Sequence, residues 1–360
     1  MNIVVDENIP LLADALSETG AVTSVSGRDI NNSLLRKTNC DALFVRSITK
    51  IDENLLKNTN VKFVGSATAG IDHVDTEYLR EKGIKFESAP SANANSVAEY
   101  VVYTVLVWAK SNNFNLHGKK AAVIGFGNVG RIIAEYFSRL GLTVLINDPP
   151  LKKEGFTFPD DYVYASLEEC CQECEIITNH VPLTKDVEFS TYKLFNKHSI
   201  NSFKLGSLFI HSSRGHVVDE KYLLERLTKR EITAAIDVWE NEPYVNPDLV
   251  KYSFMATPHI AGYSYDGKLK GALMMAKRFE EHFNLTTNKE TIESVLRTDT
   301  ILKEISVEDN TLLNHLEDSR QLKEDYMRFL HSILSDDSVI RGAAFDKLRK
   351  EYPVRRECLK

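Results

Sequence analysis

A glycine-rich turn between two apolar stretches is the feature that most constrains how this chain can fold. Residues 121–130 read AAVIGFGNVG, so an apolar run leads into the spacing Gly125-x-Gly127-x-x-Gly130. Apolar residues follow at helical spacing, and a second strand-like run then ends at Asp148. This order predicts a buried strand, a tight turn, a helix and a second strand of a parallel α/β unit.

Each residue of this turn has its own physical task. Gly125 lets the chain turn sharply, and Gly130 lets the helix pack closely on the strand. Because Gly127 has no Cβ atom, a pyrophosphate could approach its backbone. Free N–H groups at the helix start, around Asn128 and Val129, would bind the phosphates. The turn therefore predicts a dinucleotide site.

Asp148 refines that prediction. It lies eighteen residues beyond Gly130, where an acid can accept hydrogen bonds from an adenosine ribose. Its charge would repel a 2′-phosphate, so we expect NAD rather than NADP. The alternative is a glycine-rich turn in some other α/β protein, but strand, helix and acid all lie at the expected places.

Size and charge limit the remaining classes. A chain of 360 residues predicts two or three domains, and 43% hydrophobic with 26% charged residues is typical of a globular protein. The net charge of −7 argues against a general nucleic-acid or anionic-membrane binder. No apolar run is long enough to span a bilayer. Because residues 1–6 read as a strand rather than a signal peptide, we expect a cytoplasmic protein.

Three of the five cysteines, Cys170, Cys171 and Cys174, lie together. Their C-x-x-C spacing permits a metal or redox interpretation. However, no second Cys or His pair lies nearby in the sequence, and Ser166 with Glu169 fits the capping box of a helix. We therefore expect structural thiols and no metal.

The rest of the chain predicts two parallel sheets and a helical end. Expected strands of the first sheet are residues 3–5, 42–45, 61–64 and 84–86, with helices near 11–16 and 76–82. Expected strands of the second sheet, beyond those of the glycine turn, lie near 176–178, 207–211, 234–237 and 254–256, with helices near 192–195 and 219–227. A helix over 95–110 is apolar nearly all round, which indicates burial between lobes or in an interface.

The end of the chain differs in character. A helix is expected over residues 267–283, followed by a linker over 284–290. Residues 341–360 contain seven basic and three acidic residues. This excess of positive charge is either a solvated face or a basic arm that reaches an anionic site, including one in a partner subunit.

Three segments with reactive side chains are expected at the carboxyl ends of the second sheet, where open α/β sheets bind ligands. They are residues 211–215 (HSSRG), 237–243 (DVWENEP) and 257–263 (TPHIAGY). Arg214 could hold a carboxylate by two parallel hydrogen bonds, and His259 could serve as a general base with a carboxylate beside it. Above a bound NAD, such a set suggests oxidation of an alcohol next to a carboxylate.

Six ordered motifs carry a resemblance to a known family. They are residues 65–75 (GSATAGIDHVD), 93–99 (NANSVAE), 125–130 (GFGNVG), 213–219 (SRGHVVD), 237–243 (DVWENEP) and 257–262 (TPHIAG). Over residues 1 to about 285 the chain thereby resembles the D-2-hydroxyacid dehydrogenases. The resemblance implies that Arg214, Glu242 and His259 are catalytic and that Glu240 is the less favoured acid.

Within this family, further segments resemble a branch that oxidises a small phosphorylated 2-hydroxy acid in pyridoxal 5′-phosphate biosynthesis. They are residues 5–10 (VDENIP), 45–50 (VRSITK), 147–150 (NDPP), 259–263 (HIAGY) and, in a C-terminal dimerisation domain, 345–352 (FDKLRKEY). A homodimer with NAD as cofactor, binding neither nucleic acid nor membrane, is implied. Other dehydrogenases of the family, and an NAD(H)-sensing binding protein on the same fold, remain alternatives.

The implied fold class is α/β. It has two doubly wound parallel-sheet lobes, a Rossmann NAD domain and a flavodoxin-like substrate lobe, with a small C-terminal α+β dimerisation domain. The implied domains are a substrate lobe over residues 1–94 and 265–285, an NAD domain over 95–264 and a dimerisation domain over 286–360.

The resemblance also implies ligand contacts. Those to the cofactor are Gly125, Gly127, Asn128, Val129, Gly130, Asp148, Ser212, Ser213, Arg214, Asp237 and Gly262. Those to the substrate are Ser47, Thr68 and Tyr263. In the expected mechanism, backbone N–H groups near Ala69 and Gly70 help Arg214 to hold the substrate carboxylate. Candidate cations for a substrate phosphate are Arg46 and the tail's Lys347, Arg349 or Lys350. Val181 departs from the branch, which tends to have a threonine there, so we expect no side-chain contact to NAD from it.

Overall fold

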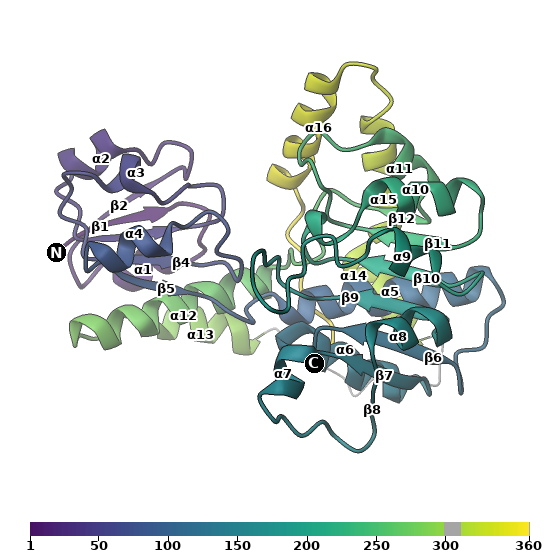
Figure 1. The fold of residues 1–360 in the computed structure, drawn as a ribbon. Helices are drawn as coiled ribbons and strands as arrows, with labels where there is room; N and C mark the ends of the chain where they lie inside the picture. Colours follow the sequence, from purple (N-terminus) through teal and green to yellow (C-terminus); the bar gives the residue numbers. More distant parts are fainter. Residues whose placement is uncertain (299–310, 360) are drawn as a thin grey trace. The chain divides into compact units, whose positions relative to one another are not determined.

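A computed structural model describes residues 1–298 and 311–359 of the chain. By its contacts the described part of the chain divides into two compact units, residues 1–93 with 264–298, and residues 94–263 with 311–359 (Figure 1). The division therefore assigns the C-terminal residues to the second unit, and the predicted separate dimerisation domain is not confirmed. Among the described residues, no helix combines the length and the apolar composition that crossing a bilayer requires.

The first unit contains a five-stranded parallel sheet in the order β2-β1-β3-β4-β5. The strands are β1 (Asn2–Asp6), β2 (Ala21–Val25), β3 (Ala42–Val45), β4 (Phe63–Ser66) and β5 (Lys85–Ser88). This order is that of flavodoxin-like sheets, as predicted. Strand β2 was not predicted, because its side chains are mostly half-buried or exposed and form no apolar run.

Helices cover both faces of this sheet. They are α1 (Leu12–Leu16), α2 (Asn32–Lys37), α3 (Glu53–Leu56), α4 (Thr76–Glu81), α12 (Tyr265–Phe283) and α13 (Glu290–Thr298). Successive residues of β1 point to opposite faces, so that Ile3 and Val5 pack with α1 and α12, whereas Val4 packs with α2 to α4. Burial on both faces explains why these strands are nearly continuous apolar runs.

The second unit contains a seven-stranded parallel sheet in the order β12-β11-β10-β9-β6-β7-β8. The strands are β6 (Lys120–Ile124), β7 (Thr143–Asn147), β8 (Val163–Tyr164), β9 (Ile176–Asn179), β10 (Leu208–His211), β11 (Thr233–Ile236) and β12 (Met255–Ala256). The strand order reverses between β6 and β9, which is where doubly wound sheets form their ligand crevice. This topology confirms the predicted Rossmann fold.

Helices flank this second sheet. They are α5 (Ala94–Ser111), α6 (Asn128–Arg139), α7 (Pro149–Lys153), α8 (Leu167–Glu173), α9 (Lys197–Asn201), α10 (Glu220–Thr228) and α11 (Pro247–Tyr252), with a short 3₁₀ helix η1 (Gly215–Val217). The predicted helix near 192–195 is wrong. Phe195 instead bridges to Val218 as extended chain, and α9 begins only at Lys197.

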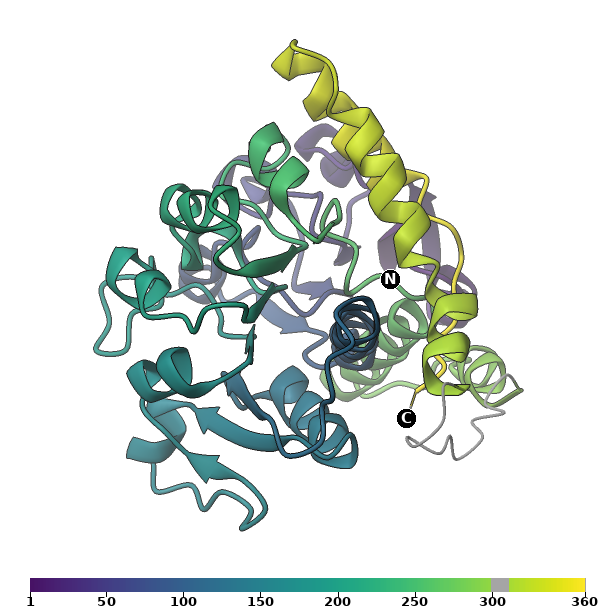
Figure 2. The same ribbon diagram turned by 90° about the vertical axis from the view of Figure 1, so that its right-hand side faces the viewer.

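The described C-terminal residues add three helices, α14 (Thr311–Arg320), α15 (Leu322–Ser332) and α16 (Ser338–Lys350), to the second unit. Helix α14 packs on α5, and α15 packs on β12 and on α16. Figure 2 shows these helices following one another along one side of the unit. No strand occurs among residues 311–359, whereas an α+β arrangement was predicted.

A buried ion pair joins this segment to α5. Glu99 and Arg320 are both fully buried, and their charged groups lie 3.6 Å apart. The carboxylate of Glu99 also accepts the backbone N–H groups of Cys358 and Leu359, at 2.5 and 2.7 Å. Arg320 donates to Ser96 Oγ at 2.8 Å. The pair therefore holds the end of the described chain against α5.

The cysteine cluster lies in the core. Cys170, Cys171 and Cys174 are buried and free, and the predicted capping box of Ser166 and Glu169 begins their helix α8. Burial raises the pKa of both Cys171 and Cys174 to about 12. These thiols are therefore poor nucleophiles near neutral pH.

Candidate active site

The glycine turn joins β6 to α6 and leaves space above Gly127. Gly125 has a φ of +91°, which a side chain rarely adopts. A Cβ atom on Gly127 would meet no heavy atom within 4 Å, whereas one on Gly130 would lie 2.0 Å from the carbonyl oxygen of Gly125. Since Gly127 also precedes the first turn of α6, a pyrophosphate fits above it, at the helix N-terminus.

Asp148, at the end of β7, braces this turn. Its Oδ2 accepts the backbone N–H of Phe126 at 2.7 Å, and its Oδ1 accepts that of Leu151 at 3.1 Å and so caps α7. Neither contact was predicted; that to Phe126 depends on the pairing of β6 with β7, whereas that to Leu151 is a local helix cap. The ribose contact of Asp148 stays a prediction.

His259 and Glu242 face each other. Nδ1 of His259 lies 2.8 Å from Oε2 of Glu242, and Oε1 of the same carboxylate accepts the backbone N–H of Trp239 at 2.9 Å. Burial alone would raise the pKa of Glu242, but His259 outweighs it and holds that pKa below its usual value. The predicted acid and base are thus brought together.

Glu240 has a different neighbourhood. It forms an ion pair with Lys193 and accepts the backbone N–H of Glu220 at 3.1 Å. Its contacts therefore tie the start of α10 to the DVWENEP loop, and Glu242 is the acid that faces the histidine.

Asp237 fixes the loop that carries His259. Its buried carboxylate accepts hydrogen bonds from Thr257 Oγ1 at 2.7 Å, from Ile260 N at 2.7 Å and from Ala261 N at 2.9 Å. His259 itself has a φ of +57°, a left-handed conformation that these bonds hold on both sides. This anchoring role was missed, since the partners lie 20 or more residues away in the sequence.

Arg214 follows β10 in the neighbouring loop. Its Nη1 donates to the carbonyl oxygen of Ser213 at 2.7 Å, and the hydroxyl of Ser213 accepts from Asn179 Nδ2 at 2.9 Å. A Cβ atom on Gly215 would lie 1.9 Å from the carbonyl oxygen of Trp239, so only glycine lets the two loops touch. The Arg214 loop and the loop of Glu242 are therefore in contact.

Two further histidines near these strand ends, His180 and His211, differ from His259 because they are deeply buried. Burial lowers the pKa of both His180 and His211 to about 3, which keeps them neutral. His180 bonds to Thr178 Oγ1 at 2.7 Å and His211 to Asn179 Nδ2 at 3.2 Å. They act as structural hydrogen-bonding groups.

In the first unit, the residues predicted to contact substrate follow two neighbouring strands. Arg46 and Ser47 follow β3, and residues 68–70 follow β4, so both sets lie at one edge of the sheet. Thr68 Oγ1 lies 2.9 Å from Ser66 Oγ. Burial lowers the pKa of Lys268 on α12, and the charge of Arg46 lowers it further, so a second, unpredicted cation lies near this edge.

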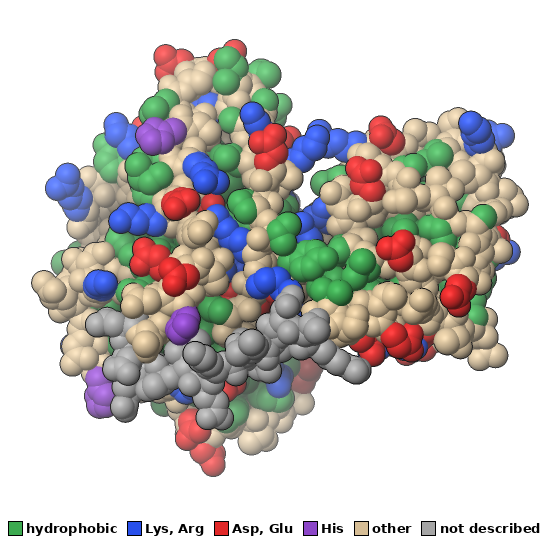
Figure 3. Space-filling model, turned by 180° about the vertical axis from the view of Figure 1, so that it is seen from behind, with side chains coloured by type: hydrophobic (Ala, Val, Ile, Leu, Met, Phe, Trp, Pro, Cys, Tyr) green, Lys and Arg blue, Asp and Glu red, His purple; other side chains and the backbone are tan. Residues whose placement is uncertain are grey.

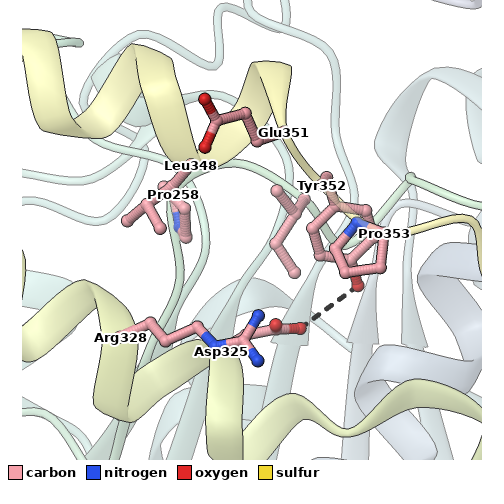
Figure 4. Close-up of a pocket in the computed structure, with 8 residues that line it drawn as sticks. Pro258, Asp325, Arg328, Leu348, Glu351, Tyr352 and Pro353 are labelled. Atoms are coloured by element: carbon pink, nitrogen blue, oxygen red, sulfur yellow. Dashed lines mark hydrogen bonds between the residues drawn. The ribbon is translucent and has the colours of Figure 1, made fainter.

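The C-terminal helices reach the histidine loop of the second unit, which continues to Tyr263. Tyr263, predicted to contact substrate, packs its ring 5.6 Å from that of Tyr352 and 5.8 Å from the guanidinium of Arg349. A cavity of about 190 Å³ opens beside them (Figure 4). Its lining comes from the histidine loop, α15 and the end of α16: Pro258, Ile260, Asp325, Arg328, Leu348, Glu351, Tyr352 and Pro353.

Figure 3 shows the face of the molecule seen from behind. Acidic and basic side chains lie interspersed over the second unit on that face. Among the described residues, no group of three or more His, Cys, Asp or Glu side chains could hold a metal ion.

The sequence matches proteins of one named family. Residues 100–261 match the family described as D-isomer specific 2-hydroxyacid dehydrogenase, NAD binding domain. The chain is also 39% identical over 363 aligned residues to an erythronate-4-phosphate dehydrogenase of Escherichia coli O17:K52:H18. That match covers 99% of this chain and 92% of the relative.

Solved structures share the fold over a smaller part of the chain. The NAD⁺-bound 3-phosphoglycerate dehydrogenase of Entamoeba histolytica superposes with a TM-score of 0.66 at 25% identity, covering 80% of this chain and 97% of that one. The TT0316 protein of Thermus thermophilus superposes with a TM-score of 0.68 at 21% identity, covering 79% and 98%. The chain therefore belongs to the NAD-dependent, D-isomer-specific 2-hydroxyacid dehydrogenases.

Proposed function

We propose that this chain oxidises 4-phospho-D-erythronate to 3-hydroxy-2-oxo-4-phosphooxybutanoate with NAD, a step of pyridoxal 5′-phosphate biosynthesis. The observation that carries the proposal is the 39% identity to erythronate-4-phosphate dehydrogenases over 99% of the chain. This sequence match includes the C-terminal helices, whereas the structural match to the 3-phosphoglycerate dehydrogenase covers only 80% of this chain.

The geometry of the second unit supports the proposed catalytic roles. His259 takes the proton of the C2 hydroxyl on Nε2, because its Nδ1 faces Glu242. Glu242 stabilises the imidazolium that forms. Arg214 holds the substrate carboxylate and stabilises negative charge that develops on the C2 oxygen. The bound nicotinamide supplies the acceptor for the C2 hydride.

Substrate recognition is proposed for the predicted residues of the first unit. Backbone N–H groups near Ala69 and Gly70 help Arg214 to hold the carboxylate, and Ser47 and Thr68 contact the remaining oxygens. Arg46 provides positive charge for the phosphate. In the second unit, Tyr263 contacts the substrate.

Cofactor contacts are proposed for two groups of residues. The glycine turn, with Asn128 and Val129, binds the pyrophosphate, and Asp148 binds the adenosine ribose. Ser212, Ser213, Arg214, Asp237 and Gly262 surround the nicotinamide half. We further propose that the chain acts as a homodimer in the cytoplasm.

The experiment is single-turnover absorbance at the NADH band, with stoichiometric enzyme and NAD. Three acids are compared: 4-phospho-D-erythronate, 3-phosphoglycerate and D-glycerate. Stoichiometric enzyme reveals chemistry even where NADH stays tightly bound. We expect a burst with 4-phospho-D-erythronate alone. A burst with another acid instead would overturn the substrate, and silence with all three would favour an NAD(H)-sensing binding protein.

A further inference from the structure

The last helix directs one of its three terminal cations toward the catalytic loops. Lys347, Arg349 and Lys350 all lie in the last turn of α16. Lys347 and Lys350 are exposed, whereas Arg349 is half-buried. The structure thus distinguishes three cations that were equivalent in the sequence.

Packing fixes α16 on the residues that follow Glu242. A Cβ atom on Gly342 would lie 2.9 Å from the ring of Tyr244 and 3.5 Å from Pro243, so this glycine allows direct contact. Phe345, one turn before Arg349, is fully buried. The helix can therefore present its last turn to the active-site loops in a fixed position.

The guanidinium of Arg349 lies beside two aromatic rings. Its Cζ atom is 5.8 Å from the ring centre of Tyr263 and 5.7 Å from that of Phe345. Its Nε atom is buried and has no hydrogen-bond partner among the described residues. The guanidinium also hydrogen-bonds to Tyr263, so the unpartnered atom is Nε alone. A buried donor without an acceptor is destabilising, which points to a further acceptor supplied by a ligand.

Glu242 is not the acceptor for Nε of Arg349. Both of its oxygens are engaged, one by Trp239 N and the other facing His259. Arg349 still acts on it through space and contributes to its lowered pKa. Burial by itself would lower the pKa of Arg349, but Tyr263 and Glu242 outweigh it and raise that pKa, so the guanidinium stays charged.

We propose that Arg349 binds the phosphate group of the substrate, beside Tyr263 and in the active site of its own subunit. The proposal rests on the proposed function, because a phosphorylated 2-hydroxy acid supplies the anion. A planar guanidinium can donate two parallel hydrogen bonds to phosphate oxygens, which an ammonium group cannot match. Arg349 is therefore a specificity-determining residue contributed by the C-terminal helices.

The kinetic test compares Arg349→Met on 4-phospho-D-erythronate and on D-erythronate, which lacks the phosphate. We expect KM for the phosphorylated acid to rise about thirtyfold, with little change in kcat/KM for D-erythronate. Lys347→Met and Lys350→Met, from the same turn, serve as matched controls and should leave both values unchanged. Arg349→Lys should give an intermediate KM, because it keeps the charge and loses the planar fork.

A binding measurement separates this proposal from the proposed function. Calorimetry follows inorganic phosphate added to the complex of the enzyme with NADH. If the wild type binds phosphate and Arg349→Met does not, the phosphate site stands even where no turnover of 4-phospho-D-erythronate occurs. Unchanged phosphate binding, or equal losses on both acids with a shifted pH profile of kcat, would overturn it. If Arg349→Met melts well below the wild type, Arg349→Lys serves for the same comparison.

Mixing two variants that are both impaired at low substrate concentration tests which subunit supplies the cation. Arg349→Met and His259→Asn are combined and assayed at low 4-phospho-D-erythronate. If Arg349 serves its own subunit, no mixed assembly contains a complete site and no activity returns. Recovery of activity would place the arginine in the partner's active site and overturn the assignment.

Discussion

Nδ1 of His259 lies 2.8 Å from Oε2 of Glu242, and the carboxylate that faces the histidine is itself held by the backbone N–H of Trp239. The backbone bond fixes the carboxylate, and the carboxylate fixes the imidazole. With Nδ1 engaged, Nε2 is the nitrogen that can accept a proton from substrate. Base strength and orientation thus depend on one short loop, residues 237–243.

Glu242→Gln tests this arrangement. The amide has nearly the same shape but carries no charge to stabilise the imidazolium, and its NH₂ group favours the wrong tautomer of His259. We expect the rate of hydride transfer to fall about 10²- to 10⁴-fold, measured by single-turnover NADH absorbance. A rate near that of the wild type would contradict the role of Glu242.

The control is Glu240→Gln, two residues earlier in the same loop. Glu240 contacts Lys193 and the start of α10 rather than the histidine. We expect this variant to keep the hydride-transfer rate, with at most a modest loss of stability.

The last two glycines of the turn, Gly127 and Gly130, should separate an effect on cofactor binding from an effect on folding. Alanine at Gly127 would meet no protein atom, so we expect an unchanged Tm and an NAD Kd raised about tenfold or more, because the methyl group occupies the space of the pyrophosphate. Alanine at Gly130 would clash with the carbonyl oxygen of Gly125 and should cost about 1–3 kcal/mol of stability. Thermal melting and NADH fluorescence titration check the pair. Similar melting temperatures for both variants would refute the distinction.

The glycine turn and most strands could be predicted because their signals are local. Residues 121–130 combine an apolar run with glycine spacing, and the parallel strands are buried on both faces, so they read as short apolar runs. The wrong prediction of a helix near residues 192–195 also comes from reliance on a local pattern. The chain turns there at Tyr192 and Lys193, and Phe195 then pairs with Val218, a partner 23 residues away.

The parts of the site that were missed depend on contacts between distant residues. Nothing near Asp237 indicates that its carboxylate holds the backbone of Ile260 and Ala261. Likewise, the approach of Gly215 to Trp239 follows from the positions of two loops and not from either sequence. Sequence motifs predicted the reactive groups but could not reveal what holds them in place.

Arg320 is predicted to position the histidine loop. Its Nη2 donates to the carbonyl oxygen of Ala261 at 3.1 Å, opposite the N–H that Asp237 holds. Above about pH 7, where Glu99 is ionised, Arg320→Met should destabilise the protein by up to about 3–5 kcal/mol, because this carboxylate is then buried without its partner. The double variant with Glu99→Gln should recover much of this stability but not the lost kcat. Urea unfolding and steady-state kinetics give the two readouts, and recovery of kcat along with stability would show that Arg320 acts on stability alone.

Glu99 predicts a pH dependence of stability. Burial raises the pKa of its carboxyl from 4.5 to about 7, although Arg320 acts in the opposite direction. The folded state therefore binds this proton more tightly than the unfolded state does, and the stability it contributes is present below about pH 4.5 and lost as the pH rises through about 7. We expect the unfolding free energy of the wild type, relative to Glu99→Gln, to decrease by roughly 2 kcal/mol between pH 5 and pH 7.5. Urea unfolding of both proteins at several pH values measures this difference, in which the titration of other groups cancels. A constant difference would show that Glu99 is ionised throughout and that Arg320 compensates for its burial.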